Sequence, residues 1–184
     1  MPAAQAPVNR PSILVKYFAY GSNMSSARIK ARVPSAEPLG VYVLAAHTLR
    51  FHKRSVDGSG KCDAFYTGLS SDKVYGVLFN IALDEKPYLD QVEGVGKGYE
   101  VKDVDLHIPS QPGQRQTAFM YYATDIAPTA VPYSWYAHHV IAGAQEFLLP
   151  EWYIRNIQAI ECKTDTDVTR QTLELAIYNT GNRP

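Results

Sequence analysis

Tyr17-Phe18-Ala19-Tyr20-Gly21-Ser22-Asn23-Met24 joins a strand-like segment to the helical pattern of SSARIKARV. A buried strand that stops at a glycine and leads into a helix leaves backbone N–H groups unpaired and aimed at one point. Gly21 allows a positive φ and the close approach of a ligand, and Ser22 and Asn23 are suitable N-cap residues. The stretch therefore predicts either a cradle for a carboxylate or developing oxyanion, or an ordinary capped joint between strand and helix.

A second informative segment, LDQVEGV, places Glu93 at the end of an amphipathic helical turn. The glycine-rich loop Gly94-Val95-Gly96-Lys97-Gly98 follows it directly. A carboxylate partly removed from water there, against Leu89 and Val92, is a better base than a solvated one. From these residues alone, a solvated glutamate at a helix end stays the alternative.

Together, FAYGSN, the acidic residue of LDQVEGV and the GYE that follows resemble the γ-glutamylcyclotransferase superfamily, from about Lys16 to Glu161. The resemblance implies a small β-barrel whose loop closes around the substrate, with Glu93 as the single acid–base residue. The substrate-binding residues that it implies are Tyr20, Gly21, Ser22, Asn23, Tyr99 and Tyr136. Packing on the barrel is the alternative for Tyr136, and burial in the core is the alternative for Tyr20.

The resemblance also implies a reaction, the release of 5-oxoproline and a free amine from a γ-glutamyl amino acid or a γ-glutamyl-protected metabolite. The substrate's own α-amine attacks its γ-carbonyl, so we expect no cofactor, and no residues have metal-ligand spacing. Family members that act on glutathione carry Leu in place of Asn23, which makes glutathione a less expected substrate. A non-catalytic protein that binds small ligands on the same fold, and an amidohydrolase that uses water, stay open as alternatives.

Composition limits the partners of the chain. Eighteen Lys and Arg balance eighteen Asp and Glu, so no overall field favours nucleic acid or an anionic membrane. Nothing approaches the ~20 consecutive apolar residues of a membrane span. Residues 1–12 lack the apolar segment of a signal peptide, and we expect a flexible tail and a cytoplasmic protein. Cys62 and Cys162 are too few for a disulfide framework. The expected partner is a small-molecule γ-glutamyl substrate, and a homodimer is left open.

Strand patterns come before most of the helical ones, without regular βαβ alternation. Strands are predicted over residues 13–20, once or twice within 40–52, and over 64–69, 73–82, 99–108 and 117–123. Helices are predicted over residues 25–31, from an N-cap at Asp84 with Leu83, Tyr88, Leu89 and Val92 on one side, and over 136–147 and 151–159. This order predicts an α+β domain over residues 13–162, built as a mixed, mostly antiparallel small β-barrel flanked by helices. A helical C-terminal extension is expected over residues 163–184.

Overall fold

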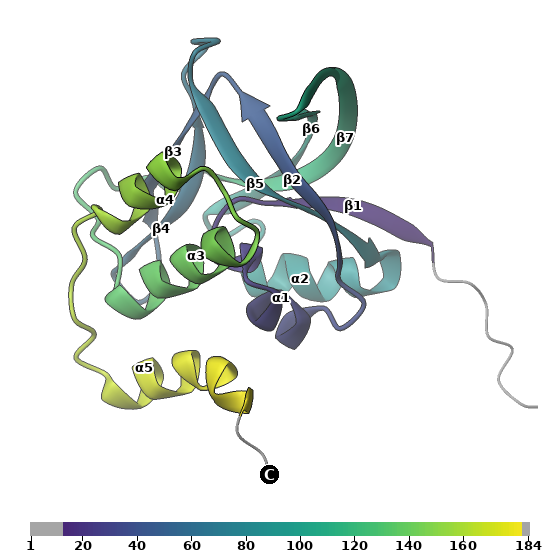
Figure 1. The fold of residues 1–184 in the computed structure, drawn as a ribbon. Helices are drawn as coiled ribbons and strands as arrows, with labels where there is room; N and C mark the ends of the chain where they lie inside the picture. Colours follow the sequence, from purple (N-terminus) through teal and green to yellow (C-terminus); the bar gives the residue numbers. More distant parts are fainter. Residues whose placement is uncertain (1–12, 182–184) are drawn as a thin grey trace, which may run out of the picture.

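Five strands close into a barrel in the computed structural model, which describes residues 13–181 (Figure 1). The order around the barrel is β1, β5, β2, β6, β7; β1 and β7 pair in parallel, and the other pairs are antiparallel. The strands are β1 (Leu14–Ala19), β2 (Glu37–Ala45), β3 (His47–Arg54), β4 (Gly60–Tyr66), β5 (Lys73–Ala82), β6 (Tyr99–Ile108) and β7 (Gln111–Ala123). The predicted α+β class with a mixed, mostly antiparallel barrel is therefore confirmed. The predicted tail, residues 1–12, lies outside the described residues.

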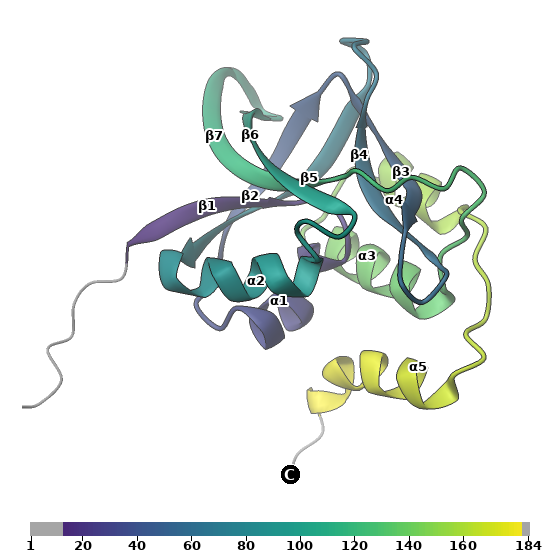
Figure 2. The same cartoon turned by 180° about the vertical axis from the view of Figure 1, so that it is seen from behind.

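Helices cover one side of the barrel and continue beyond it. They are the α-helices α1 (Ser26–Arg32), α2 (Lys86–Glu93), α3 (Ser134–Glu146), α4 (Glu151–Gln158) and α5 (Val168–Leu175), and the 3-10 helices η1 (Ser22–Met24), η2 (Leu83–Glu85) and η3 (Ala176–Gly181). In both views α1, α2 and α3 lie along the same side of the barrel, and α5 lies farther out beyond α3 (Figures 1 and 2). Within residues 13–181, no helix has the length and apolar character needed to span a membrane.

The strand β5 forms the middle of the core. Its bounds agree with the prediction, and Val77, Leu78 and Phe79 are fully buried in succession. Because successive side chains of a strand point to opposite faces, both faces of β5 are covered. Burial of each such side chain contributes roughly 1.5–3 kcal/mol. A side chain at Gly76 would lie within 2.7 Å of the Phe18 ring, so glycine lets β1 pack closely against β5.

The strands β3 and β4 form a separate two-stranded sheet beside the barrel. The segment predicted as one or two strands contains two, which separate at Ala46, a residue with a φ of 59°. The pairing of β3 with β4 shifts register between Arg50 and Lys53, where β3 has one residue more than β4. Such a bulge changes the direction in which side chains point.

The beginning of the second predicted helix is wrong. Asp84 is not its N-cap, because Leu83–Glu85 forms η2 and the α-helix begins at Lys86, with Pro87 in its first turn. Proline is favoured there because its missing N–H would have no partner in a first turn. Of the four side chains predicted to share one side of this helix, only Leu89 is buried. The three other side chains are exposed: Leu83, Tyr88 and Val92.

One further segment, the turn between β6 and β7, differs from its prediction. The turn between β6 and β7 is confined to residues 109–110, so β7 begins six residues before the predicted strand. In the segment expected to form a helical C-terminal extension, the described residues contain α5 and η3.

Candidate active site

The loop that follows β1 is held tightly against the β3–β4 sheet. A Cβ atom at Gly21 would lie 2.9 Å from Cβ of Cys62, so only glycine fits. Its φ of −118° is negative, so the close approach, and not a positive φ, explains the glycine. The predicted N-caps are also wrong. Gly21 precedes η1, Ser25 precedes α1, and neither helix has a side-chain cap.

The same loop leaves backbone donors free. The N–H groups of Ser22 and Asn23 begin η1 and have no backbone acceptor among residues 13–181. Unpaired N–H groups at the start of a helical turn favour a negatively charged or carbonyl oxygen. Ser22 is nearly buried and lines the cavity described below, so these donors lie beside a cavity.

Glu93 is the last residue of α2. The helix ends there because Gly94 adopts the left-handed conformation (φ 78°, ψ 45°), and its N–H donates to the carbonyl oxygens of Asp90 and Gln91. Gly96 and Gly98 also have positive φ, so the three glycines allow the tight path from α2 into β6. The Glu93 side chain is 17% exposed, which agrees with the expectation of a partly desolvated carboxylate.

Asn23 connects the loop to Glu93. Its amide nitrogen lies 2.9 Å from Oε1 of Glu93 and 2.9 Å from the hydroxyl of Tyr17, and it donates to both. Nη1 of Arg32 donates to Oδ1 of Asn23 at 2.8 Å and to Oε1 of Glu93 at 2.6 Å. One carboxylate oxygen is therefore held from two sides, by an amide and by a guanidinium.

A narrow cavity lies where these groups meet. All seven residues implied by the resemblance line it: Tyr20, Gly21, Ser22, Asn23, Glu93, Tyr99 and Tyr136. Its volume is about 30 Å³, so only a small polar group enters without movement of side chains. Segments far apart in the sequence thus meet at one cavity, with the loop on one side and the end of α2 on the other.

The predicted tyrosines face the cavity as neutral phenols. Tyr20 donates its hydroxyl to the carbonyl oxygen of Tyr121 at 2.6 Å, and Tyr99 donates to the carbonyl oxygen of Cys62. The hydroxyl of Tyr136 accepts from the N–H of Cys62 at 3.0 Å. Burial raises the pKa of Tyr20, Tyr99 and Tyr136 well above the ordinary value. These tyrosines therefore do both things: they pack in the core, as the alternative readings of Tyr20 and Tyr136 expected, and they also line the cavity.

Four residues of the site were not predicted as site residues from the sequence: Tyr17, Arg32, Cys62 and Tyr121. Tyr17 offers a donor, because its oxygen accepts from Asn23 and its own hydrogen has no acceptor among the described residues. Burial raises the pKa of the Cys62 thiol to about 12, so this sulfur stays protonated and is a poor nucleophile. The position of Tyr17 in the motif stretch is a sequence signal that could have identified it. No such signal exists for Arg32, Cys62 and Tyr121.

The C-terminal segment contacts α1 and α3, the helices beside the site. Arg28 of α1 forms an ion pair with Glu174 at 2.5 Å and donates to Nε2 of His139 at 2.9 Å.

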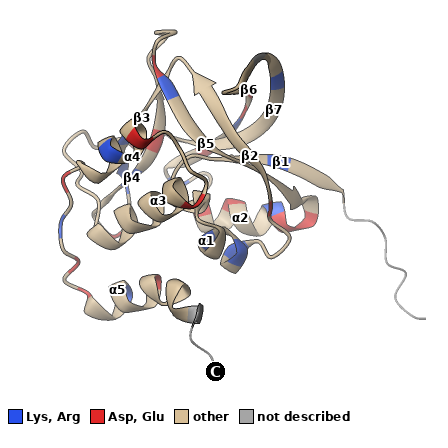
Figure 3. Ribbon diagram, in the orientation of Figure 1, with Lys and Arg blue, Asp and Glu red and all other residues tan. Residues whose placement is uncertain are grey.

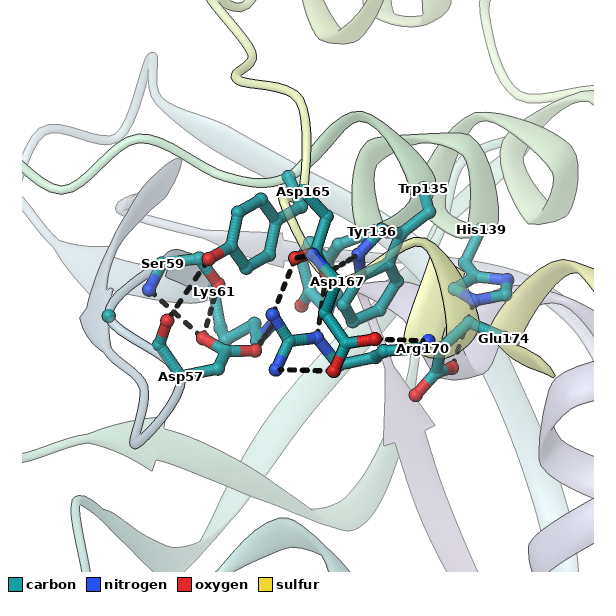
Figure 4. Close-up of polar contacts among 12 residues, drawn as sticks. Asp57, Ser59, Lys61, Trp135, Tyr136, His139, Asp165, Asp167, Arg170 and Glu174 are labelled. Carbon is teal, nitrogen blue, oxygen red and sulfur yellow. Dashed lines mark hydrogen bonds and ion pairs between the residues drawn. The ribbon is translucent and has the colours of Figure 1, made fainter. Parts of the chain in front are cut away.

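A second group of contacts is centred on Asp165, which accepts from Nε1 of Trp135 at 2.8 Å and from two nitrogens of Arg170. Figure 4 shows the contacts of Asp165 and Arg170 beside Tyr136 and Lys61. Within residues 13–181, no three His, Cys, Asp or Glu side chains gather as metal ligands would.

Comparisons with known proteins agree with this architecture. A family model described as AIG2-like matches residues 73–157. Gamma-glutamylcyclotransferase of Homo sapiens is 30% identical over 165 residues, covering 86% of this chain and 85% of the human protein. The protein of the same name from Mus musculus is 30% identical over 152 residues, covering 79% of this chain and 78% of the mouse protein.

Solved structures give the same result. One named gamma-glutamyl cyclotransferase superposes with a TM-score of 0.80 at 29% identity, covering 91% of this chain and 99% of that chain. Likeness in sequence and in fold thus extends over most of the chain. The chain therefore belongs to the γ-glutamylcyclotransferase family and is a γ-glutamylcyclotransferase-like enzyme.

Proposed function

We propose that the enzyme converts a γ-glutamyl amino acid or γ-glutamyl-protected metabolite into 5-oxoproline and a free amine. The α-amine nitrogen of the substrate forms a bond to its own γ-carbonyl carbon, and the amide bond to the departing nitrogen breaks. Two protons pass overall from the attacking nitrogen to the departing one, so atoms and charge balance without water. Binding in the ring-forming conformation removes much of the entropic barrier.

Glu93 is the residue that moves these protons. As a carboxylate it accepts a proton from the attacking nitrogen, and as a carboxylic acid it returns one to the departing nitrogen. General acid–base catalysis of this kind contributes about 10²–10⁴-fold. The observation that carries the proposal is the 2.9 Å contact between Asn23 and Glu93, which brings the carboxylate to the loop with the free N–H groups.

The loop and the tyrosines bind the substrate. The N–H groups of Ser22 and Asn23 and the hydroxyl of Tyr17 are donors that a substrate carboxylate or the developing oxyanion could use. The buried tyrosines Tyr20, Tyr99 and Tyr136 fix the shape of the narrow cavity. The protonated thiol of Cys62 gives no support to a covalent intermediate on sulfur.

Replacing Glu93 by Gln tests the proposal, because the amide keeps the shape of the side chain and removes the base. We expect kcat for 5-oxoproline release to fall at least about a hundredfold. Glu151→Gln, on the exposed surface of α4, is the matched control and keeps the rate. Near-normal activity of Glu93→Gln would overturn the proposal.

Product analysis separates the alternatives. An amidohydrolase on the same fold would release glutamate, and a non-catalytic binding protein would release neither product. We expect 5-oxoproline in a one-to-one ratio with the free amine, measured by chromatography of both products. Glutamate as the main product would favour hydrolysis.

A further inference from the structure

A groove lies beside β3 and shares no lining residue with the narrow cavity. Its walls come from β3, from the segment between β7 and α3, and from the residues that follow α4, and its volume is about 710 Å³. We call it the outer groove. A volume of this size lies within the range of small-molecule sites in proteins.

The segment between β7 and α3 is fixed to the β3–β4 sheet at two points, and Figure 2 shows it passing beside both strands. The N–H of Ala127 donates to the carbonyl oxygen of His52 at 2.7 Å, and the N–H of Gly60 donates to that of Val131 at 3.0 Å. Pro128, between the two contacts, has a fixed φ. This wall of the groove is therefore formed before a ligand arrives, which lowers the entropic cost of binding.

Most of the lining of the outer groove is apolar. The larger apolar side chains that line it are Leu49, Phe51, Phe65, Ile126, Val131 and Ile160. Three ionisable side chains lie among them: Arg50, His52 and Glu161. Apolar walls with a small number of polar groups are typical of sites that bind small organic molecules.

His52 is held in place by a buried carboxylate. Its side chain is 9% exposed, and Nε2 lies 2.8 Å from Oδ2 of Asp63, whose Oδ1 accepts the N–H of Ala123 at 2.9 Å. Nδ1 of His52 has no hydrogen-bond partner among residues 13–181 and is not sealed from solvent. The ring thus offers one unused nitrogen at the groove, which accepts from a ligand when neutral and donates to one when protonated.

Arg50 is a cation that has no ion pair and no side-chain hydrogen bond in the described part of the chain. Asp63 is its neighbour across the β3–β4 ladder, but both carboxylate oxygens of Asp63 are already bonded. The guanidinium carbon lies 3.9 Å from the centre of the Phe65 ring, and the His52 ring packs edge-on against the same ring at 5.6 Å. Stacking uses the flat face of a guanidinium, so its N–H groups stay free for a carboxylate.

The unpaired cation is a local feature of the groove. Figure 3 shows both signs of charge spread over several elements, in keeping with the balanced composition. Glu161 is the one carboxylate among the described residues that line the groove, and it is exposed and forms no ion pair with Arg50. The guanidinium that lies over Phe65 therefore stays available to an anion from outside the chain.

We propose that the outer groove is a second ligand site, which binds a small molecule with an apolar or aromatic body and a carboxylate. The apolar walls bury the body, the free N–H groups of Arg50 bind the carboxylate, and Nδ1 of His52 forms a further hydrogen bond. The inference goes beyond the proposed function and does not depend on it, because the groove and the narrow cavity have no residue in common.

The test uses 1-naphthylacetate as the probe and 1-naphthylacetamide as its uncharged counterpart. Amide chemical shifts of the isotope-labelled full chain are followed as each compound is added. We expect the acid to bind with a Kd of about 1 mM or lower, as is usual for a ligand of this size, and to shift residues 49–52 and 129–131. The amide should bind at least about tenfold more weakly, because it loses a charge-assisted hydrogen bond.

Arg50→Gln removes the charge and keeps a polar side chain beside Phe65. We expect it to weaken binding of the acid to the level of the amide, with binding of the amide retained. Arg54→Gln is the matched control, because Arg54 lies on the same strand, pairs with Asp125 and does not line the groove. This variant should keep the wild-type preference, and the dispersion of each spectrum shows that the variant is folded.

Several results would overturn the proposal. They are equal wild-type affinity for the acid and the amide, no binding of either compound, and shifts confined to the loop and Glu93, which would place the probe in the narrow cavity. A loss of preference in Arg54→Gln equal to that in Arg50→Gln would also overturn it, since charge on β3 in general would then suffice. Shifts of the groove residues with protein concentration, without the probe, would show that a second copy of the chain covers the groove. The wild-type comparison decides the ligand class even if Arg50→Gln does not fold.

Discussion

At the scale of single residues, Asn23 is the group on which the geometry of the site depends most. Its amide nitrogen donates to Glu93 and Tyr17, and its oxygen accepts from Arg32, so both ends of one amide are used. An aspartate has nearly the same shape but cannot donate. Asn23→Asp would therefore replace a hydrogen bond to Glu93 by repulsion between two carboxylates.

We expect Asn23→Asp to lower kcat/KM by about tenfold or more, the usual effect of losing a hydrogen bond to a charged group. Steady-state release of 5-oxoproline measures this. Asn156→Asp, on α4 and away from the narrow cavity, is the control that should keep wild-type activity. A fully active Asn23→Asp would show that the orientation of Glu93 does not depend on this amide.

The sequence allowed Glu93 and the loop to be predicted because each belongs to a recognisable local pattern. Arg32 and Tyr121 could not be found in this way. Arg32 reaches Glu93 only because α1 packs beside α2, and Tyr121 comes from the last barrel strand. Contacts of this kind depend on how the barrel closes, and no local spacing encodes them.

At the scale of elements, α3 acts as the support of the loop. A Cβ atom at Gly143 would lie 2.5 Å from the carbonyl carbon of Met24 and 2.6 Å from its Cβ, and closer still to the nitrogen of Ser25. The helix therefore touches η1 with its backbone. This contact explains the glycine at position 143, because any larger residue would separate α3 from the loop.

We expect Gly143→Ala to destabilise the fold by about 1–3 kcal/mol or more, as overpacking of a rigid contact does. The loop would shift as well, so kcat/KM should fall in the protein that still folds. Urea denaturation and 5-oxoproline release measure the two effects. Gly113→Ala is the control, since nothing lies within 4 Å of a Cβ atom there. Equal stability of the two variants would mean that α3 does not support the loop closely.

The bounds of a helix or strand could be predicted where a local sequence pattern determines them. The bounds of β5 and β6 match the prediction because β5 is rich in Val, Tyr, Phe and Ile, β6 alternates between apolar and charged residues, and both end at clear breaks. The start of α2 does not, because Leu83–Glu85 can form either a 3-10 turn or the first turn of an α-helix. The separation of β3 and β4 from the barrel depends on strand pairing, which alternation alone leaves open.

At the scale of the whole molecule, the C-terminal segment links the end of the chain to the beginning of α1. Tyr178 donates to the hydroxyl oxygen of Ser25 at 3.1 Å and lies 2.8 Å from Nδ1 of His139. Arginine can only donate, so Nε2 of His139 accepts from Arg28 and Nδ1 carries the hydrogen. The network therefore requires a neutral histidine, and it joins α5 and η3 to the helix that carries Arg32.

The acid stability of the protein should reflect this neutral histidine. Burial lowers the pKa of His139 from 6.5 to about 4, with Glu174, 3.3 Å from Nε2, acting in the opposite direction and Arg28 in the same one. Between these values the unfolded chain binds the proton and the folded one does not. The free energy of unfolding therefore falls as the pH drops from about 6.5 to about 4, by roughly 3 kcal/mol. Denaturation in urea at several pH values measures this loss.

In His139→Gln we expect a shallower pH dependence of the free energy of unfolding over that interval, whatever the stability of the variant at neutral pH. His138→Gln is the matched control, because His138 is the adjacent, exposed residue of the same helix and should keep the wild-type slope. A slope unchanged in His139→Gln would show that other groups cause the acid sensitivity. A slope lost in both variants would show that burial of His139 is not its cause, since His139 is fully buried and His138 is exposed.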